Sequence, residues 1–441
     1  MLICSPDGYR VANSIDKLTN RMIDKSIFYL CKMDYQVHQL QNGIRVLHKP
    51  SPSNISHACI IINAGSRDEE ETKDGLAHFI EHLLFKETEK RNTSQILNRL
   101  ELVGADLNAY TTKEYTCVHA SFLKPHLERS LDLFEDIVFH SVFPEEEMKK
   151  EKEVILDEIS SYQDQPDEAI NDDFEDLLFE GHPLGRNILG TAQSVQSFKK
   201  SDIQHFMKAN YRTDEIVIGI FGDYDFKTII RISEKLFGHI PPNLPARNRT
   251  QPNRYTVLNK RFAKPINQSH FVMGTRSFSI HHPNKTGFLL LNNLLGGTGM
   301  SSRLNMEIRE KYGIAYTIES NYTPMSDTGI FSIYFGTDSE KTEKALKLVH
   351  KELKKLRDQK LGPLQLKQAK NKFIGQIALG EENRMGLIIS MSKSLLDYGR
   401  VDSLEEVFAK INAVTETQIL EIANEMFDPK TLSSLVFSPA E

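Results

Sequence analysis

The order of hydrophobic and polar residues predicts a chain that mixes strands and helices. Alternation with period two indicates strands, which we expect over residues 35–40, 44–48 and 57–63 and in a hairpin over 107–122. Amphipathic repeats of three and four residues indicate helices, which we expect over residues 75–85, 94–103, 124–138 and 144–161. Strands and helices are interspersed without strict alternation, which is typical of an α+β fold.

Two matches within the chain indicate an internal duplication. Residues 143–159 align with residues 361–377, 218 positions later, and residues 203–221 align with 419–437, 216 positions later. A shared amphipathic pattern could explain one match by chance, but hardly two at similar shifts. Residues 238–253 are rich in Pro, Asn and Arg and lack periodicity, which is typical of a linker.

We therefore expect four segments along the chain. They are an N-terminal extension over residues 1–33, a first domain over 34–237, a linker over 238–253 and a related second domain over 254–441. Each domain is expected to be a mainly antiparallel sheet packed against helices.

Composition and charge exclude several classes of function. The 441 residues are 39% hydrophobic and 26% charged, which is a globular composition, and no stretch approaches the ~18 apolar residues of a membrane span. With 54 basic and 60 acidic residues the net charge is −6, so neither nucleic acid nor an anionic membrane is an expected partner. The four cysteines are widely spaced and residues 1–33 lack a signal-peptide pattern, so we expect reduced thiols and a cytoplasmic location.

Candidate chemistry begins in residues 75–85 (GLAHFIEHLLF), where His78, Glu81 and His82 form H-x-x-E-H. On a helix, residues three and four apart lie on one face at ~5–6 Å. Two imidazoles one turn apart can therefore bind one metal ion, and the carboxylate can handle a proton beside it. The alternative is an amphipathic helix whose histidines face water or backbone carbonyls, and a third ligand would decide between the two.

The helix expected over residues 144–161 supplies candidates for that third ligand. Glu151 and Glu158 are seven residues apart and so lie within ~20° of each other around the helix, whereas Glu153 points to the opposite side. A solvated face paired with lysines is the expected place for Glu145, Glu146, Glu147 and Glu153. At the duplicated positions stand Ala369 and Gln376, so only the first half keeps the two carboxylates.

H-x-x-E-H with a glutamate 76 residues after its last histidine resembles the inverzincin zinc metallopeptidases. This family includes pitrilysin, insulin-degrading enzyme and the mitochondrial processing peptidase, and the chain is most similar to its short, two-domain bacterial members. The resemblance implies one Zn²⁺ per chain bound by His78, His82 and Glu158, with Glu81 as general base and Glu151 as a supporting acid. Looser matches to the family are Leu40, Asn42, Gly43, Asn108, Ala109 and residues 182–185 and 189–191.

The second half carries a further stretch that is similar to the family. Residues 296–316 (GGTGMSSRLNMEIREKYGIAY) match its glycine-rich loop followed by R-x₆-Y, here Arg309 and Tyr316. Taken alone, GGTG is a flexible turn, because the phosphate-binding G-x-x-x-x-G-K-[ST] pattern is absent. The resemblance implies that Arg309 and Tyr316 contact the substrate and stabilise the oxyanion. It implies the same contact role for Asn108 and Ala109, which the sequence alone would assign to an ordinary hairpin strand.

Together these features predict a zinc endopeptidase that cleaves peptides or unfolded segments inside a chamber. Long family members enclose their substrate between two halves, so this shorter chain is expected to form a homodimer in which Arg309 and Tyr316 serve the partner's zinc site. The alternative is a non-catalytic structural or peptide-binding subunit, which the family also contains. Such subunits usually lack part of the metal motif, which is complete here. A metal-free enzyme would leave the ligand spacing of the two histidines unexplained.

Overall fold

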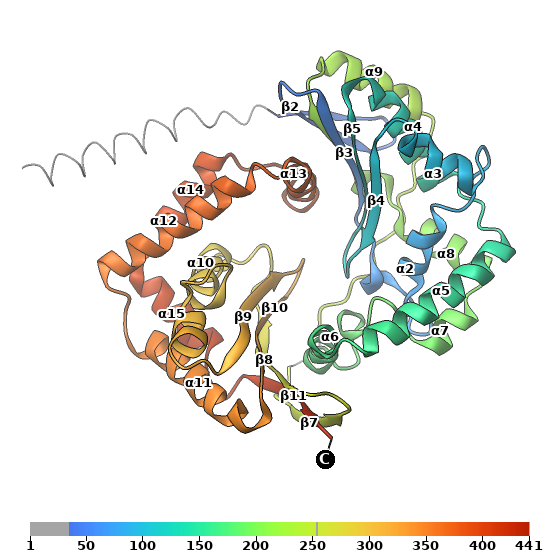
Figure 1. The fold of residues 1–441 in the computed structure, drawn as a ribbon. Coiled ribbons are helices and arrows are strands. Elements are labelled where there is room, and N and C mark those ends of the chain that lie inside the picture. The colour runs from blue at the N-terminus through green and yellow to red at the C-terminus, as the bar shows by residue number, and fades with distance from the viewer. Residues whose placement is uncertain (1–34, 253–254, 441) are drawn as a thin grey trace, which may run out of the picture.

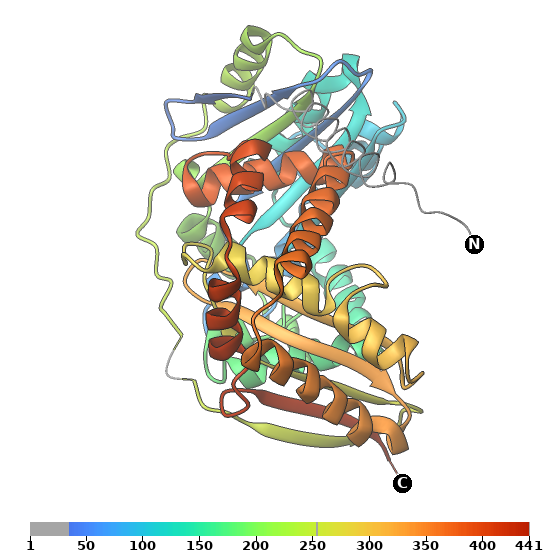
Figure 2. The same cartoon turned by 90° about the vertical axis from the view of Figure 1, so that its left-hand side faces the viewer.

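The computed structural model describes residues 35–252 and 255–440, which form two halves that each combine a sheet with helices (Figure 1). The extension expected over residues 1–33 lies outside the described residues. The segment that joins the halves, beyond residue 237, runs along one side of the molecule (Figure 2).

The first half is built on a six-stranded sheet with the order β1-β2-β6-β3-β5-β4. Its strands are β1 (Gln36–Gln39), β2 (Arg45–Pro50), β3 (Ile55–Ile62), β4 (Asp106–Thr111), β5 (Thr116–Leu123) and β6 (Ile216–Gly222). Only β2 and β6 are parallel among these neighbours. The hairpin strand β4 lies at the edge of the sheet.

The second half repeats this arrangement with the order β7-β11-β8-β10-β9. Its strands are β7 (Asn259–Lys264), β8 (Ser269–Ser277), β9 (Ala315–Pro324), β10 (Gly329–Thr337) and β11 (Ser433–Pro439). Counted along the chain, the strands follow the same order as β2-β6-β3-β5-β4, and again one pair, β7 and β11, is parallel. The prediction of an α+β fold with two related, mainly antiparallel sheets is confirmed.

The helices show the same repeat. In the first half they are α2 (Leu76–Leu83), α3 (Thr93–Glu101), α4 (Leu127–Phe139), α5 (Glu145–Gln163), α6 (Pro166–Leu178), α7 (Ala192–Ser197), α8 (Lys200–Asn210) and α9 (Phe226–Phe237). In the second half they are α10 (Lys285–Gly296), α11 (Thr342–Asp358), α12 (Pro363–Gly380), α13 (Arg384–Tyr398), α14 (Leu404–Ala413) and α15 (Glu416–Met426). Helix α12 begins 218 residues after α5, and α15 begins 216 residues after α8, as the two sequence matches require. Among the described helices, none has the length and apolar character needed to cross a membrane.

Each half also places one helix on the sheet of the other. Helix α6 packs against β8 and β11, where Phe174 shares a core with Val272. Helix α13 packs against β3 and β6, where Ile388 shares a core with Val217. Two apolar interfaces therefore hold the halves together. The linker expected over residues 238–253 stays a prediction, since helices from each half pack across that boundary.

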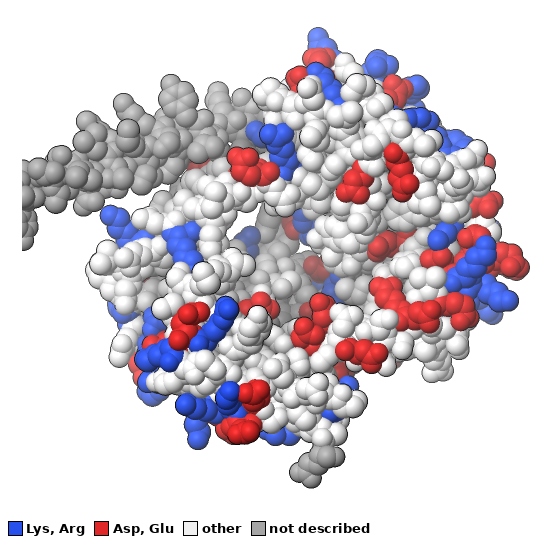
Figure 3. Space-filling model, in the orientation of Figure 1, with Lys and Arg blue, Asp and Glu red and all other residues white. Residues whose placement is uncertain are grey.

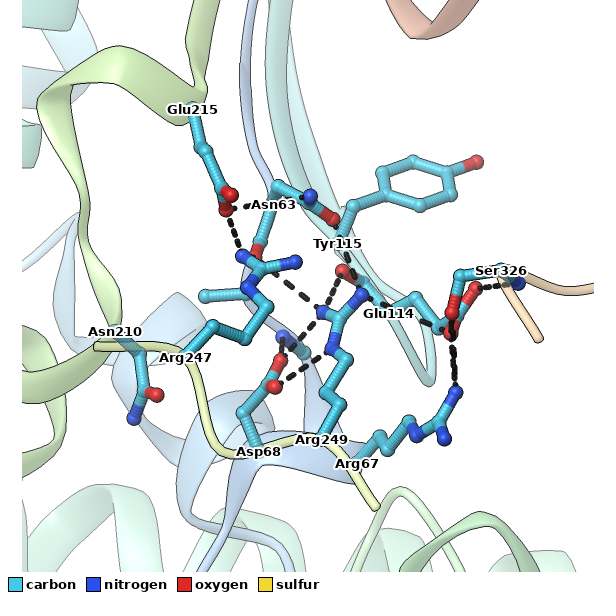
Figure 4. A network of polar contacts seen from close by, with 12 residues as sticks. Asn63, Arg67, Asp68, Glu114, Tyr115, Asn210, Glu215, Arg247, Arg249 and Ser326 are labelled. Atoms are coloured by element: carbon cyan, nitrogen blue, oxygen red, sulfur yellow. Dashed lines mark hydrogen bonds and ion pairs between the residues drawn. The ribbon is translucent and has the colours of Figure 1, made fainter. Parts of the chain in front are cut away.

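A buried polar network reinforces this joint at the turn between β4 and β5. Arg67 donates to both carboxylate oxygens of Asp327, at 2.8 and 2.6 Å, and to Glu114 at 2.7 Å. Arg249, from the connecting segment, donates to both oxygens of Asp68 at 2.8 and 2.7 Å and to the carbonyl of Glu114 (Figure 4). We call Arg67, Asp68, Glu114, Arg249 and Asp327 the Arg67 network. It connects the first half, the linker and the turn after β9.

Candidate active site

The H-x-x-E-H residues lie on α2, whose first turn is held by Glu69 and Gly75. The Glu69 carboxylate accepts hydrogen bonds from the amides of Gly75 at 3.0 Å and Ala77 at 2.8 Å. Amides in the first turn of a helix have no partner within the helix, and negative charge is favoured there. Gly75 has φ of 91°, and a Cβ at this position would lie 2.5 Å from the carbonyl oxygen of Leu189. Glu69 therefore stabilises the start of α2, and Gly75 allows α2 to begin close to the backbone at Leu189.

Three candidate metal ligands meet where α2 contacts α5. His78 Nε2 lies 3.9 Å and His82 Nε2 3.7 Å from the same oxygen of Glu158. The ligand atoms of these residues all lie within 4.8 Å of one another. Ligands at ~2.0–2.1 Å from a tetrahedral zinc ion are about 3.3 Å apart. Two imidazoles and one carboxylate with these separations fit Zn²⁺.

Glu151 supports the cluster from behind His82. The Nδ1 of His82 donates a hydrogen bond to Glu151 at 3.0 Å, and Lys86 Nζ lies 2.6 Å from the other carboxylate oxygen. Burial would raise the pKa of Glu151, but the contacts with His82 and Lys86 outweigh burial and lower the pKa. Because Nδ1 carries the proton of a neutral His82, Nε2 keeps its lone pair for a metal ion.

The two histidines titrate differently. Burial and the charge of His82 lower the pKa of His78 to about 4, so His78 is neutral near pH 7. Burial would also lower the pKa of His82, but the hydrogen bond to Glu151 and the surrounding carboxylates outweigh it and raise the pKa. A metal ion must therefore displace a proton from His82 more often than from His78.

Glu81 lies on the same helix between the two histidines. Its Oε2 atom is buried and has no hydrogen-bond partner among the described residues. Burial raises the pKa of Glu81, an effect that Thr111 and His82 oppose. A carboxylate oxygen without a partner, beside the candidate metal ligands, can accept a proton from water. The raised pKa of Glu81 lies closer to neutral pH, where a general base works best.

Strand β4, next to α2, carries Asn108 and Ala109. Among the described strands β4 pairs with β5 alone, so no other described strand pairs with its outer edge. Asn108 is exposed and its Oδ1 accepts a hydrogen bond from the amide of Ala109 at 2.8 Å, while Ala109 is half-buried. An extended peptide could add to this edge by main-chain hydrogen bonds.

Arg309 and Tyr316 are adjacent, on a separate part of the molecule. Arg309 lies in a π-helical turn (Asn305–Glu310) and its guanidinium carbon is 5.7 Å from the centre of the Tyr316 ring. The Tyr316 side chain, on edge strand β9, is 81% exposed. The pair lines two cavities of about 350 and 290 Å³, and all described residues lining them belong to the second half. The structure thus brings Arg309 and Tyr316 together without bringing them to His78, His82 and Glu158.

In the second half, the residue equivalent to Glu158 has a different role. Gln376 donates to the carbonyl of Thr298 at 2.7 Å and accepts from the side chain of Asn293 at 2.8 Å. It thereby holds the glycine-rich loop against α12. Where the first half has the candidate ligand Glu158, the second half has Gln376, which binds that loop.

Several of the looser family matches have structural roles. The Asn42 amide donates to the carbonyls of Phe237 at 2.8 Å and Ile240 at 3.0 Å, which caps the C-terminus of α9. His182 Nε2 lies 3.1 Å from the carbonyl of Thr250 and ties the first half to the linker. Neither residue contacts the candidate ligands in the described structure.

Sequence reasoning missed Glu69 and Lys86. Lys86 lies four residues after His82 but beyond the end of α2 at Leu83, so helical spacing alone does not predict its approach to Glu151. Glu69 lies six residues before Gly75 in an irregular segment, and no periodic pattern marks it.

Comparisons with known proteins agree with these observations. The family model described as Insulinase (Peptidase family M16) matches residues 45–192, and the model described as Peptidase M16 inactive domain matches residues 197–373. The chain is 32% identical over 388 residues to the uncharacterized zinc protease YmxG of Bacillus subtilis, covering 88% of this chain and 94% of that protein. It is 30% identical over 406 residues to an uncharacterized zinc protease of Rickettsia bellii, covering 92% and 98% of the two chains.

Solved structures share the fold. A protease from Helicobacter pylori superposes with a TM-score of 0.85 at 21% identity, covering 92% of this chain and 99% of the other. A peptidase M16 inactive domain from Pseudomonas fluorescens gives a TM-score of 0.84 at 22% identity, with the same coverage of 92% and 99%. The resemblance noted in the sequence is confirmed, and the chain belongs to peptidase family M16.

Proposed function

We propose that the protein is a zinc-dependent endopeptidase whose active centre is formed by His78, Glu81, His82 and Glu158. The observation that carries this proposal is the approach of two imidazole Nε2 atoms to one Glu158 oxygen, beside the partnerless oxygen of Glu81. The names of the relatives, which are zinc proteases, support it. A non-catalytic subunit is less well supported, because the complete motif is assembled around one point.

The chain's own residues would divide the work of peptide hydrolysis. Zinc, when bound, polarises a peptide carbonyl and lowers the pKa of a water molecule. Glu81 would accept a proton from the attacking water and pass it to the leaving amine. Glu151 would hold His82 in the tautomer that leaves Nε2 free. Because β4 packs against α2, a peptide added at Asn108 and Ala109 would run next to these groups.

We further propose that two chains enclose the substrate, which would be a peptide or an unfolded segment. The surface is hollowed between the two halves of the molecule (Figure 3). Tyr316 is exposed on its edge strand and lies beside the partly exposed Arg309, so a second chain could reach this pair. In a symmetric dimer they would reach the zinc site of the partner, where the Tyr316 hydroxyl can donate to the developing oxyanion.

Removal of the metal tests the proposed activity. Treatment with a zinc chelator is expected to abolish cleavage of a quenched fluorescent peptide, and added Zn²⁺ is expected to restore it, whereas Mg²⁺ is not, because it prefers oxygen ligands. Cleavage that survives chelation would contradict the zinc mechanism. A zinc-loaded protein without cleavage would favour the non-catalytic subunit.

Mixed dimers test whether the site is completed by the partner. Chains with Glu81→Gln and chains with Tyr316→Phe are each expected to have low activity. After subunit exchange at equal amounts, half of the dimers are mixed and each has one complete site, so about a quarter of wild-type activity should return. Mixing Glu81→Gln with His82→Ala chains is the control, because both defects lie in the same half and no recovery is expected. A Glu81→Gln and Tyr316→Phe mixture that stays inactive would show that Tyr316 does not act in trans.

A further inference from the structure

We propose that Glu135, His140 and His239 form a second binding site for a divalent transition-metal ion, on the first half and apart from the candidate active site. Glu135 lies in α4, His140 directly follows α4, and His239 follows α9 by two residues. These two helices pack against each other, and the rings of Phe139 and Phe237 at their ends meet edge to face with centroids 6.3 Å apart. Packing of the helices thus brings the two histidines together.

The three side chains converge on one point. His140 Nε2 lies 2.6 Å and His239 Nε2 3.4 Å from the same oxygen of Glu135. The two imidazole rings are stacked, with centroids 6.2 Å apart and planes at 11°. One ligand atom from each residue lies within 4.8 Å of the others, as at the candidate active site. The separation of His140 from Glu135 would have to open by several tenths of an ångström around an ion.

The Glu135 carboxylate is buried, so its orientation is fixed and its negative charge must be balanced by a partner. The Glu135 side chain is 2% exposed, and a buried carboxylate is stable only when it is paired or coordinates a metal. Its partners in the structure are His140, His239 and Lys90, whose Nζ lies 3.4 Å from the other carboxylate oxygen. Lys90 is half exposed and leaves the oxygen that faces the two histidines open to an ion.

The donor set selects the ion. Two imidazoles and a carboxylate suit Zn²⁺ and related divalent ions, as at the candidate active site. The Glu89 carboxylate lies 3.6 Å from His140 Nδ1, on the opposite side of the ring from Glu135. Because the closer carboxylate, Glu135, faces His140 Nε2, an ion would have to replace the proton at Nε2, and Glu89 would then pair with the proton at Nδ1. The C-termini of α4 and α9 both lie at this point, and a helix C-terminus favours a cation.

An ion at this site would join three parts of the first half. It would hold the end of α4 to the end of α9, where the chain enters the linker, and would draw in the loop that carries Glu89. That loop already contacts the end of α4, since the Glu89 amide donates to the His140 carbonyl at 3.0 Å. His239 is 57% exposed, so solvent can supply the remaining ligands.

Zinc binding in a chain without the candidate active site tests the proposal. A His78→Ala/His82→Ala chain, dialysed against Zn²⁺, is expected to bind one equivalent and to have a higher melting temperature than without the ion. Adding His140→Ala and His239→Ala should remove both effects. Adding His205→Ala instead is the matched control, because His205 is an exposed histidine paired with Glu70 on another part of the first half, and one equivalent should remain.

The same chains separate this proposal from the proposed peptidase activity. Because the readout is bound zinc, the result does not depend on whether the intact protein cleaves peptides. His239→Ala alone, a change at an exposed side chain, should weaken binding by at least about tenfold without unfolding the chain. No zinc bound by the His78→Ala/His82→Ala chain, or equal binding after His140 and His239 are removed, would overturn the second site.

Discussion

Replacing Glu81 with glutamine is expected to lower kcat for peptide hydrolysis by about 10²–10⁴-fold, because an amide cannot accept the proton that a general base removes. The replacement keeps the size and shape of the side chain, and neither histidine nor Glu158 is altered. Zinc content should therefore stay at the wild-type level, and KM should change little. Steady-state cleavage of a quenched fluorescent peptide, together with metal analysis of the same samples, measures both quantities.

The matched control is Glu153→Gln, which removes a carboxylate from the exposed side of α5. This variant should retain wild-type kcat, since Glu153 lies on the opposite side of the helix from Glu151 and Glu158. A Glu81→Gln chain that keeps more than a tenth of wild-type kcat would exclude Glu81 as the general base. Equal losses in both variants would point to a general effect of charge.

Replacing Arg67 with methionine is expected to lower the free energy of unfolding by about 3–5 kcal/mol, because Asp327 loses its two-pronged partner and Glu114 keeps only Arg249 and Ser326. The Arg67 side chain is 1% exposed, while those of Glu114 and Asp327 are 10% and 19% exposed. Methionine fills much of the space but cannot pair with either acid. Urea unfolding at neutral pH measures the loss. Lys235→Met is the control, because Lys235 pairs with Glu128 at the surface, and a change within ~0.5 kcal/mol is expected there.

The pH dependence of that loss gives a second check. Burial would raise the pKa of Glu114, but Arg249, Ser326 and Arg67 outweigh burial and lower it. A carboxylate with a lowered folded-state pKa contributes stability above its usual value of 4.5 and loses that contribution as the pH falls toward the lowered pKa. The difference between wild type and Arg67→Met should therefore narrow below about pH 4.5. A difference that is small at neutral pH would mean that the network does not secure the joint between the halves.

Much of the fold follows from local patterns. The pattern over residues 144–161 predicted a helix that the structure places at Glu145–Gln163, and the period of 3.6 put Glu151 and Glu158 on one face. His78, Glu81 and His82 could be grouped because their contacts lie within one helical turn. The duplication predicted the organisation of the whole chain, because two matches at similar shifts indicate that the two halves share one fold.

Contacts between distant segments could not be predicted in this way. An amphipathic pattern shows that α6 and α13 have an apolar face but not that each covers the sheet of the other half. The Arg67 network draws on four separate segments whose charges look ordinary in the sequence. Glu135 and His140 are close in the chain, but His239 reaches them only because α4 and α9 pack together. Such sites depend on packing geometry, which the sequence pattern does not contain.

Zinc bound by His78, His82 and Glu158 is the basis of the proposed peptidase activity. The most direct measurement is the anomalous scattering of zinc-loaded crystals on either side of the zinc absorption edge. We expect a peak about 2.0–2.2 Å from His78 Nε2, His82 Nε2 and a Glu158 oxygen, which should disappear in the His82→Ala variant. Zinc-loaded crystals without a peak between these three atoms would show that His78, His82 and Glu158 do not bind zinc.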